Sequence, residues 1–178
     1  TSVSKLYGEI LLKLIKINDD VYIILNVNLD KLLDICSYIT TPKSINYDDI
    51  NLSNKNNDKL KTFCIFLINC FKSLIIPSDI LFKSIQLTQT ELLTKYDNES
   101  HESNINDYKA YCEVVNEINH ILISNSYHLI CTKEYEKDYN NIYSNIEKII
   151  GLKNKTKNLT NKIIFKQMDL YEKYKPNY

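Results

Sequence analysis

Several residue types are missing from this sequence or scarce in it. The 178 residues contain no arginine and no tryptophan, only two glycines, three prolines and one methionine, and a single alanine, Ala110. Because all 22 basic residues are lysines, the chain cannot recognise phosphate or guanine through bidentate guanidinium contacts. With only Gly8 and Gly151 available, a glycine-rich loop that cradles phosphate is excluded as well.

The abundant residues indicate the base composition of the genome rather than the function of the protein. Asn, Lys, Ile and Tyr have AT-rich codons, whereas the scarce residues have GC-rich or G-containing codons. We therefore expect an organism or virus with a very AT-rich genome, such as a parasite or a virus. The only methionine is Met168, so we also expect a fragment or a processed part of a longer protein.

The charge distribution argues against two classes of partner. The formal net charge is zero, with 22 basic and 22 acidic residues, and the two signs are interspersed along the chain. A nucleic-acid-binding protein needs a basic surface that displaces counterions. A helix that lies on a membrane surface needs a basic face opposite its apolar one, and neither pattern is visible. We predict no nucleic-acid partner.

The five cysteines occupy apolar positions of helical patterns, where a free thiol behaves as a small hydrophobic residue. Cys64 and Cys70 lie six residues apart on one expected helix and point in different directions, so they should not form a disulfide. No Cys-x-x-Cys pair or zinc-ligand spacing occurs. An odd number of cysteines without a disulfide framework favours a reducing, intracellular compartment. The cysteines are Cys36, Cys64, Cys70, Cys112 and Cys131.

The most apolar segment comprises residues 58–76. Its apolar residues recur at helical spacing and also fill much of the remaining circumference, which is typical of a buried helix. Asp58 can cap its start, and Pro77 ends it. Lys61, Asn69 and Lys72 interrupt the apolar run, so we expect a core helix and no transmembrane segment.

The rest of the chain shows further amphipathic helices and no pair of convincing strands. Residues 21–27 would also suit a strand, but there is no second strand to pair with them. We therefore predict an all-α, single-domain bundle of six or seven helices around the central hydrophobic helix at 58–76. Two polar stretches, 43–57 and 97–107, are expected to be mobile loops. The other expected helices cover about 4–17, 21–40, 78–96, 107–124, 127–150 and 160–173, with a break near 124–126 and Gly151 as a C′ glycine.

The sequence contains only incomplete versions of metal-binding and catalytic motifs. Glu117 and His120 match the Glu-x-x-His pattern of di-iron bundles, and Glu113 lies on a nearby face, but no second such motif exists. Cys112 and His120 are too far apart on one helix for an activating hydrogen bond. We therefore predict no catalytic, cofactor-binding or metal-binding residues and no cofactor, and an enzyme is the least favoured function.

One row of side chains suggests an interface. Tyr135, Tyr139 and Tyr143 recur every fourth residue on one expected helix, and tyrosine is enriched at protein interfaces. The alternative is that these rings cover the edge of the core. From this row and the exclusions above, we predict a non-catalytic protein–protein interaction module, a scaffold or regulatory subunit, whose partner is another protein or a second copy. The alternative is a helical carrier of an apolar ligand, or a secreted or surface helical protein of a parasite or virus.

Overall fold

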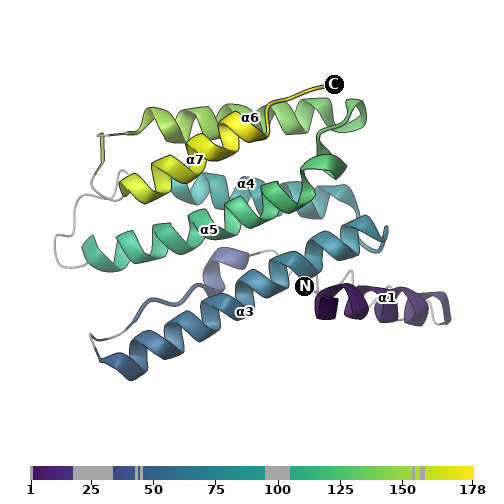
Figure 1. Cartoon of the computed structure of the whole chain (residues 1–178), viewed down its shortest axis with the longest axis horizontal. Coiled ribbons are helices and arrows are strands. Elements are labelled where there is room, and N and C mark those ends of the chain that lie inside the picture. The colour runs from purple at the N-terminus through teal and green to yellow at the C-terminus, as the bar shows by residue number, and fades with distance from the viewer. Residues whose placement is uncertain are drawn as a thin grey trace.

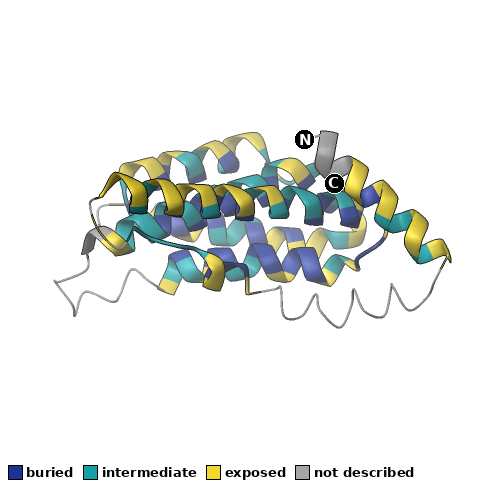
Figure 2. Ribbon diagram, turned by 90° about the horizontal axis from the view of Figure 1, so that it is seen from below, coloured by how far each residue is buried: buried dark blue, intermediate teal, exposed yellow. Residues whose placement is uncertain are grey.

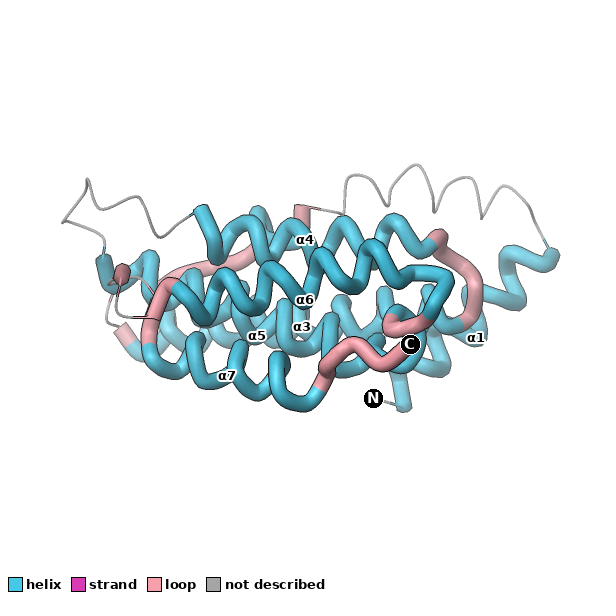
Figure 3. Tube along the Cα trace, turned by 90° about the horizontal axis from the view of Figure 1, so that it is seen from above, coloured by secondary structure: helices cyan, strands magenta, loops and turns pink. Residues whose placement is uncertain are grey.

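The architecture is all-helical, as predicted (Figure 3). A computed structural model describes most of the chain, and no strand occurs in the part that it describes. The predicted helix over 21–40 and the predicted loop over 97–107 fall largely outside the described residues. The described residues are 2–17, 34–42, 44, 46–94, 105–153, 155–156 and 159–178.

The helices pack side by side as a bundle with one peripheral helix (Figure 1). Helices α6 and α7 lie together, α4 and α5 lie next to them, and α3 crosses beneath α5. Helix α1 contacts α3 and lies at one end of the molecule. The elements are α1 (Ser2–Ile17), η1 (Ile35–Tyr38), α3 (Tyr47–Lys72), α4 (Ser78–Thr94), α5 (Ile105–Ile130), η3 (Lys133–Tyr135), α6 (Glu136–Gly151) and α7 (Asn161–Lys173).

Helix α5 holds the bundle together, because it contacts α3, α4 and α7. Its inward side chains, such as Val115, Ile118 and Leu122, are fully buried. The apolar face of α3 joins the same core through Cys64 and Leu67. Figure 2 shows the buried residues gathered between the helices and the exposed ones on the outside. No described helix is long and apolar enough to cross a membrane.

Helix α3 begins eleven residues earlier than Asp58, the start that the sequence predicts. The side chain of Asn46 accepts a hydrogen bond from the backbone of Asp48 (3.0 Å) and so caps the new start at Tyr47. The loop expected over 43–57 is therefore wrong from Tyr47 onward. The inward positions of this first part include polar residues, Ser53 and Asn57, which hide the helical periodicity.

The end of α3 differs from the prediction at Leu74. The helix ends at Lys72, and Leu74 adopts a left-handed conformation (φ 57°) with 88% of its surface exposed. The backbone of Ile75 donates to the carbonyl of Cys70, and that of Leu74 donates to the carbonyl of Phe71, which is a Schellman closure. Leu74 therefore points into solvent and is not part of the apolar stripe to which the sequence assigned it.

Helices α5 and α6 also depart from the predicted boundaries. The break expected at residues 124–126 is wrong, because α5 continues to Ile130 and the Ser126 hydroxyl donates to the Leu122 carbonyl within the helix. The chain then turns through η3 before α6 starts at Glu136. Gly151 is the last residue of α6 and does not have a positive φ, so it is not a left-handed C′ glycine.

A row of buried amides joins α4, α5 and α7 inside the bundle. The Asn119 amide donates to the Thr88 hydroxyl (2.8 Å), and Gln167 donates to the side-chain oxygens of Asn116 (2.8 Å) and Asn119 (3.2 Å). All four side chains are at most 1% exposed. The Oε1 atom of Gln167 has no hydrogen-bond partner in the described structure. Polar groups therefore fix part of a core that is otherwise mainly apolar.

Candidate functional site

The structure separates the three tyrosines of the predicted interface. Tyr139 is fully buried, and its hydroxyl donates to the carbonyl of Tyr174 (2.6 Å). Its ring packs against Tyr127, with 5.9 Å between ring centroids. In the isolated chain Tyr139 is thus a core residue rather than part of an exposed row.

Tyr135 and Tyr143 are half-buried and also make contacts within the chain. The Tyr135 ring lies 5.3 Å from that of Phe82. Tyr143 stacks on Tyr171 at 4.6 Å, and its hydroxyl donates to the Tyr171 carbonyl (3.0 Å). Tyr139 and Tyr143 thus attach α6 to the C-terminal tail and to α7, whereas Tyr135 of η3 packs against Phe82 of α4 and Phe71 of α3. An interface formed by Tyr135, Tyr139 and Tyr143 stays a prediction.

The buried tyrosines predict a loss of stability at high pH. Burial raises the pKa of Tyr139, and burial together with the hydrogen bond to Tyr171 raises the pKa of Tyr143 to about 12. The unfolded chain releases these protons near pH 10, whereas the folded chain retains them. The unfolded state is therefore stabilised relative to the folded state as the pH rises above 10. The ionisation of Tyr139 in the unfolded chain should by itself lower the free energy of unfolding by about 1.4 kcal/mol for each pH unit above 10. Urea unfolding at pH 9, 10 and 11 checks this, and Tyr139→Phe should make the dependence shallower. An unchanged slope in that variant would contradict it.

The Glu-x-x-His motif lies in a network of ion pairs. Glu117 of α5 contacts Lys61 of α3 (2.6 Å) and two lysines of α7, Lys162 (3.6 Å) and Lys166 (3.7 Å). Burial alone would raise the pKa of Glu117, but the hydrogen bond with Lys61 and the charges of the lysines lower it overall. A carboxylate surrounded by ammonium groups is poorly suited to a metal ion, and its role here is to join three helices.

Three buried thiols are held in their protonated form, which is weakly nucleophilic. Burial raises the pKa of Cys36 and of Cys64 to about 12 and that of Cys70 to about 11, so these thiols stay protonated at neutral pH. Burial, and next the charge of Lys166, lowers the pKa of His120. All five cysteines are free, and four of them are buried. No group of three or more potential metal ligands occurs among the described residues.

Among the described residues, the largest group of exposed apolar side chains lies on α1. Leu6, Tyr7, Ile10, Leu14 and Ile17 are between 43% and 81% exposed. At 3.6 residues per turn they occupy one sector of about 100° of the helix. We call these five residues the α1 apolar face. The helical pattern of residues 4–17 places four of them on one apolar stripe with Leu11 and Ile15, but it does not show that only one side of α1 meets the bundle.

Helix α1 is attached to the bundle by a different side. Gly8 is buried against α3, where the Cβ atom of Asn69 lies 3.8 Å from the position that a Cβ would take, and Leu11 and Ile15 pack on the main core. The remaining side of α1 is polar and includes Glu9, Lys13 and Lys16, all exposed. Apolar residues thus cover about two thirds of the circumference of α1, and α3 uses only part of that surface.

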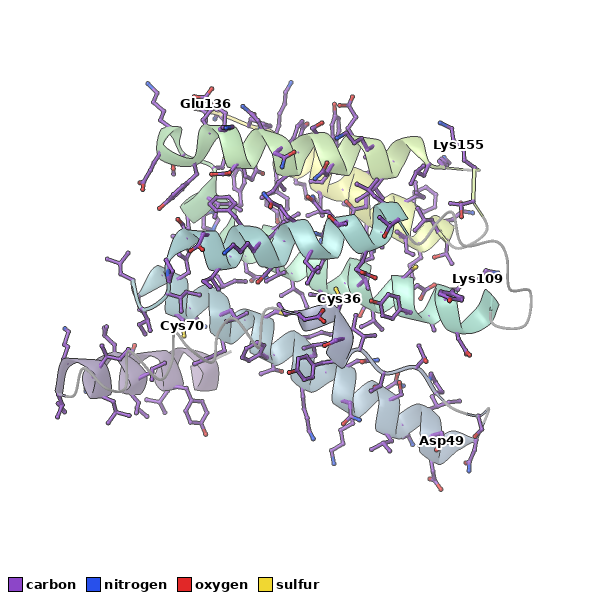
Figure 4. The ribbon with its side chains drawn as sticks, turned by 180° about the vertical axis from the view of Figure 1, so that it is seen from behind. Cys36, Asp49, Cys70, Lys109, Glu136 and Lys155 are labelled. Atoms are coloured by element: carbon purple, nitrogen blue, oxygen red, sulfur yellow. The ribbon has the colours of Figure 1, made fainter. Side chains whose placement is uncertain are left out.

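A second surface feature is a pocket of about 360 Å³ between η1 and α3. Tyr38 and Thr40 form one wall, and side chains from successive turns of α3 form the other. Leu60 and Phe63 supply its apolar surface, and Lys59 is its only ionisable cation among the described residues. The α3 residues that line it are Asn56, Lys59, Leu60 and Phe63. Figure 4 places Cys36 of η1 among the helices and Asp49 at the start of α3.

Comparison of this chain with known protein families, curated protein sequences and solved structures found no match. Any function must therefore be argued from the surfaces just described. The two features that could receive a partner are the α1 apolar face and the η1–α3 pocket. Both depend on how neighbouring elements pack, which the sequence pattern does not show.

Proposed function

We propose that this chain is a non-catalytic protein–protein interaction module that binds a helix of another protein through the α1 apolar face. The observation that carries the proposal is the exposure of all five residues of this face, up to 81% at Ile17, on a helix that contacts the bundle through α3. A contiguous exposed apolar surface of this kind marks interaction sites.

The spacing of the face suits a helical partner. Tyr7, Ile10, Leu14 and Ile17 are separated by three, four and three residues. Alternation of three and four is the spacing of helix–helix seams, in which side chains of one helix fit between those of the other. The partner would therefore present its own stripe of aliphatic residues along about two to three turns.

Charge favours a different protein over a second copy. Among the described side chains, the exposed charged residues on the polar side of α1 are Lys13, Lys16 and Glu9, a net positive set. Lys13 borders the α1 apolar face on the helix circumference. Two copies would bring lysines toward lysines, whereas a partner stripe flanked by Asp or Glu would form ion pairs. We therefore infer an acidic amphipathic helix as the partner.

Site-specific photo-crosslinking tests this proposal. A benzophenone amino acid at Tyr7 should give a discrete adduct in lysate from cells that make the protein, and mass spectrometry should identify a helical segment with acidic flanks. The same group at Tyr47, which is 75% exposed on α3, is the matched control and should not give that adduct. Leu14→Lys should abolish the Tyr7 adduct without changing the helical circular dichroism, since Leu14 is 47% exposed.

Three outcomes would contradict the proposal. Adducts that are the same at Tyr7 and Tyr47 would show that the face is not selective. A dimer in sedimentation equilibrium that Leu14→Lys dissociates would assign the face to a second copy. Binding to vesicles containing anionic lipid, again lost in Leu14→Lys, would assign it to a membrane surface.

A further inference from the structure

The η1–α3 pocket is built on a fixed backbone. The backbone of Thr40, two residues after the end of η1, makes three hydrogen bonds with side chains of α3. Asn57 accepts from the backbone N–H of Thr40 (3.0 Å) and donates to its carbonyl (2.8 Å), and the Ser53 hydroxyl donates to the same carbonyl (2.6 Å). Ser53 and Asn57 are 5% and 4% exposed. A wall held in this way needs little ordering when a ligand binds, which favours affinity.

The size of the pocket suits a small organic molecule. A dry apolar cavity of about 150 Å³ holds benzene. At about 360 Å³, this pocket has room for a body larger than a single ring, and it lies at the lower end of the range of ligand pockets. Its apolar surface comes from the Phe63 ring, the Leu60 side chain and the face of Tyr38. Flat aromatic bodies fit such surroundings.

The charge of the pocket selects the polar end of the ligand. Lys59 forms no ion pair with any carboxylate in the described part of the chain. The neighbouring Asp58 is already paired with Lys61 (3.2 Å). Among the described residues that line the pocket there is no carboxylate that would repel an anion. Asn56 adds an amide one turn before Lys59.

We propose that the η1–α3 pocket binds a small aromatic carboxylate, with the rings between Tyr38 and Phe63 and the carboxylate on Lys59. This site is independent of the α1 apolar face, since it uses η1 and the middle of α3. The protein would thus receive a small-molecule ligand in addition to a protein partner.

Titration with 1-naphthoate and its neutral isostere 1-naphthamide, followed by protein NMR chemical shifts, tests the proposal. Both compounds should shift the resonances of Tyr38, Leu60 and Phe63. Lys59→Gln should weaken 1-naphthoate binding about fivefold, as expected for a partly solvated ion pair, and leave 1-naphthamide unchanged. Tyr38→Ser should weaken both compounds, because it removes the wall. Both replaced side chains are exposed, so both variants should fold.

Lys72→Gln is the matched control, because Lys72 is an exposed lysine of α3 outside the pocket. It should bind both compounds as the native protein does. The proposal is overturned if neither compound shifts the pocket resonances. It is also overturned if Lys59→Gln weakens both compounds equally, or if Lys72→Gln has the same effect as Lys59→Gln.

Discussion

Replacement of Tyr139 by alanine is expected to lower the free energy of unfolding by about 3–5 kcal/mol, the cost typical of removing a large buried aromatic ring. Tyr139 is fully buried between α6 and the C-terminal tail, and its ring contacts Tyr127. The variant would leave a cavity and would also remove the hydroxyl that donates to the Tyr174 carbonyl. Equilibrium unfolding in urea, followed by circular dichroism, measures the effect.

Two milder variants separate the ring from the hydroxyl. Tyr139→Phe keeps the packing and should cost about 1 kcal/mol for the lost hydrogen bond. Tyr178→Phe removes a hydroxyl that contacts the Glu136 carbonyl at 3.3 Å from a residue that is 39% exposed, and it should change stability by less than about 0.5 kcal/mol. If Tyr139→Ala were as stable as the native chain but lost a binding partner, Tyr139 would belong to an interface and not to the core.

Replacement of Asn57 by alanine should destabilise the chain by about 2–4 kcal/mol, because both backbone groups of Thr40 would lose their amide partner. The Ser53 hydroxyl would still serve the Thr40 carbonyl, but the described structure offers no other acceptor for the Thr40 N–H. The neighbouring Asn56→Ala is the matched control, since Asn56 lies half-exposed at the pocket, and it should stay within about 0.5 kcal/mol of the native chain.

Hydrogen exchange adds a local measurement to the urea experiment. In Asn57→Ala the Thr40 amide should exchange much faster, while the amides of α5 keep their protection in proportion to global stability. Equal stability of the Asn57→Ala and Asn56→Ala variants would contradict the role assigned to Asn57 in fixing η1 on α3.

Local sequence signals predicted some of these elements well. The expected helix over 160–173 is observed as Asn161–Lys173, and the one over 78–96 as Ser78–Thr94. Both have aliphatic residues on the buried side and a clear start or stop signal. Pro77 and the apolar stripe after Asp58 also identified the second half of α3.

Two of the misses, the start of α3 and the break expected in α5, share a physical cause, which is polar residues that face inward. Ser53 and Asn57 look like loop residues because their partner, Thr40, lies 13 and 17 residues away in sequence. Ser126 looks like a helix break but bonds to a carbonyl of its own helix. Periodicity of apolar residues cannot reveal a helix whose buried positions are satisfied by distant hydrogen bonds.

The candidate sites could not be predicted from the sequence for a related reason. The pocket exists only because hydrogen bonds hold the segment after η1 against one particular part of α3. The exposure of the α1 apolar face depends on which side of α1 meets α3. The tyrosine row was visible in the sequence, but the acceptors of its hydroxyls are backbone carbonyls of Tyr171 and Tyr174, which no local pattern indicates.

The buried amides of α4, α5 and α7 bear on how this sequence chooses one packing among many. Its core is rich in isoleucine and leucine, which have the same volume and similar hydrophobicity, so sliding α7 by one turn along α5 would still bury aliphatic surface. Such a slide would carry Gln167 about 5.4 Å along the axis and break its hydrogen bonds with Asn116 and Asn119, whereas Asn119 would keep its bond with Thr88. The amides therefore determine the register of α7 against α5. They contribute less to the depth of the native energy minimum than to its separation from shifted alternatives.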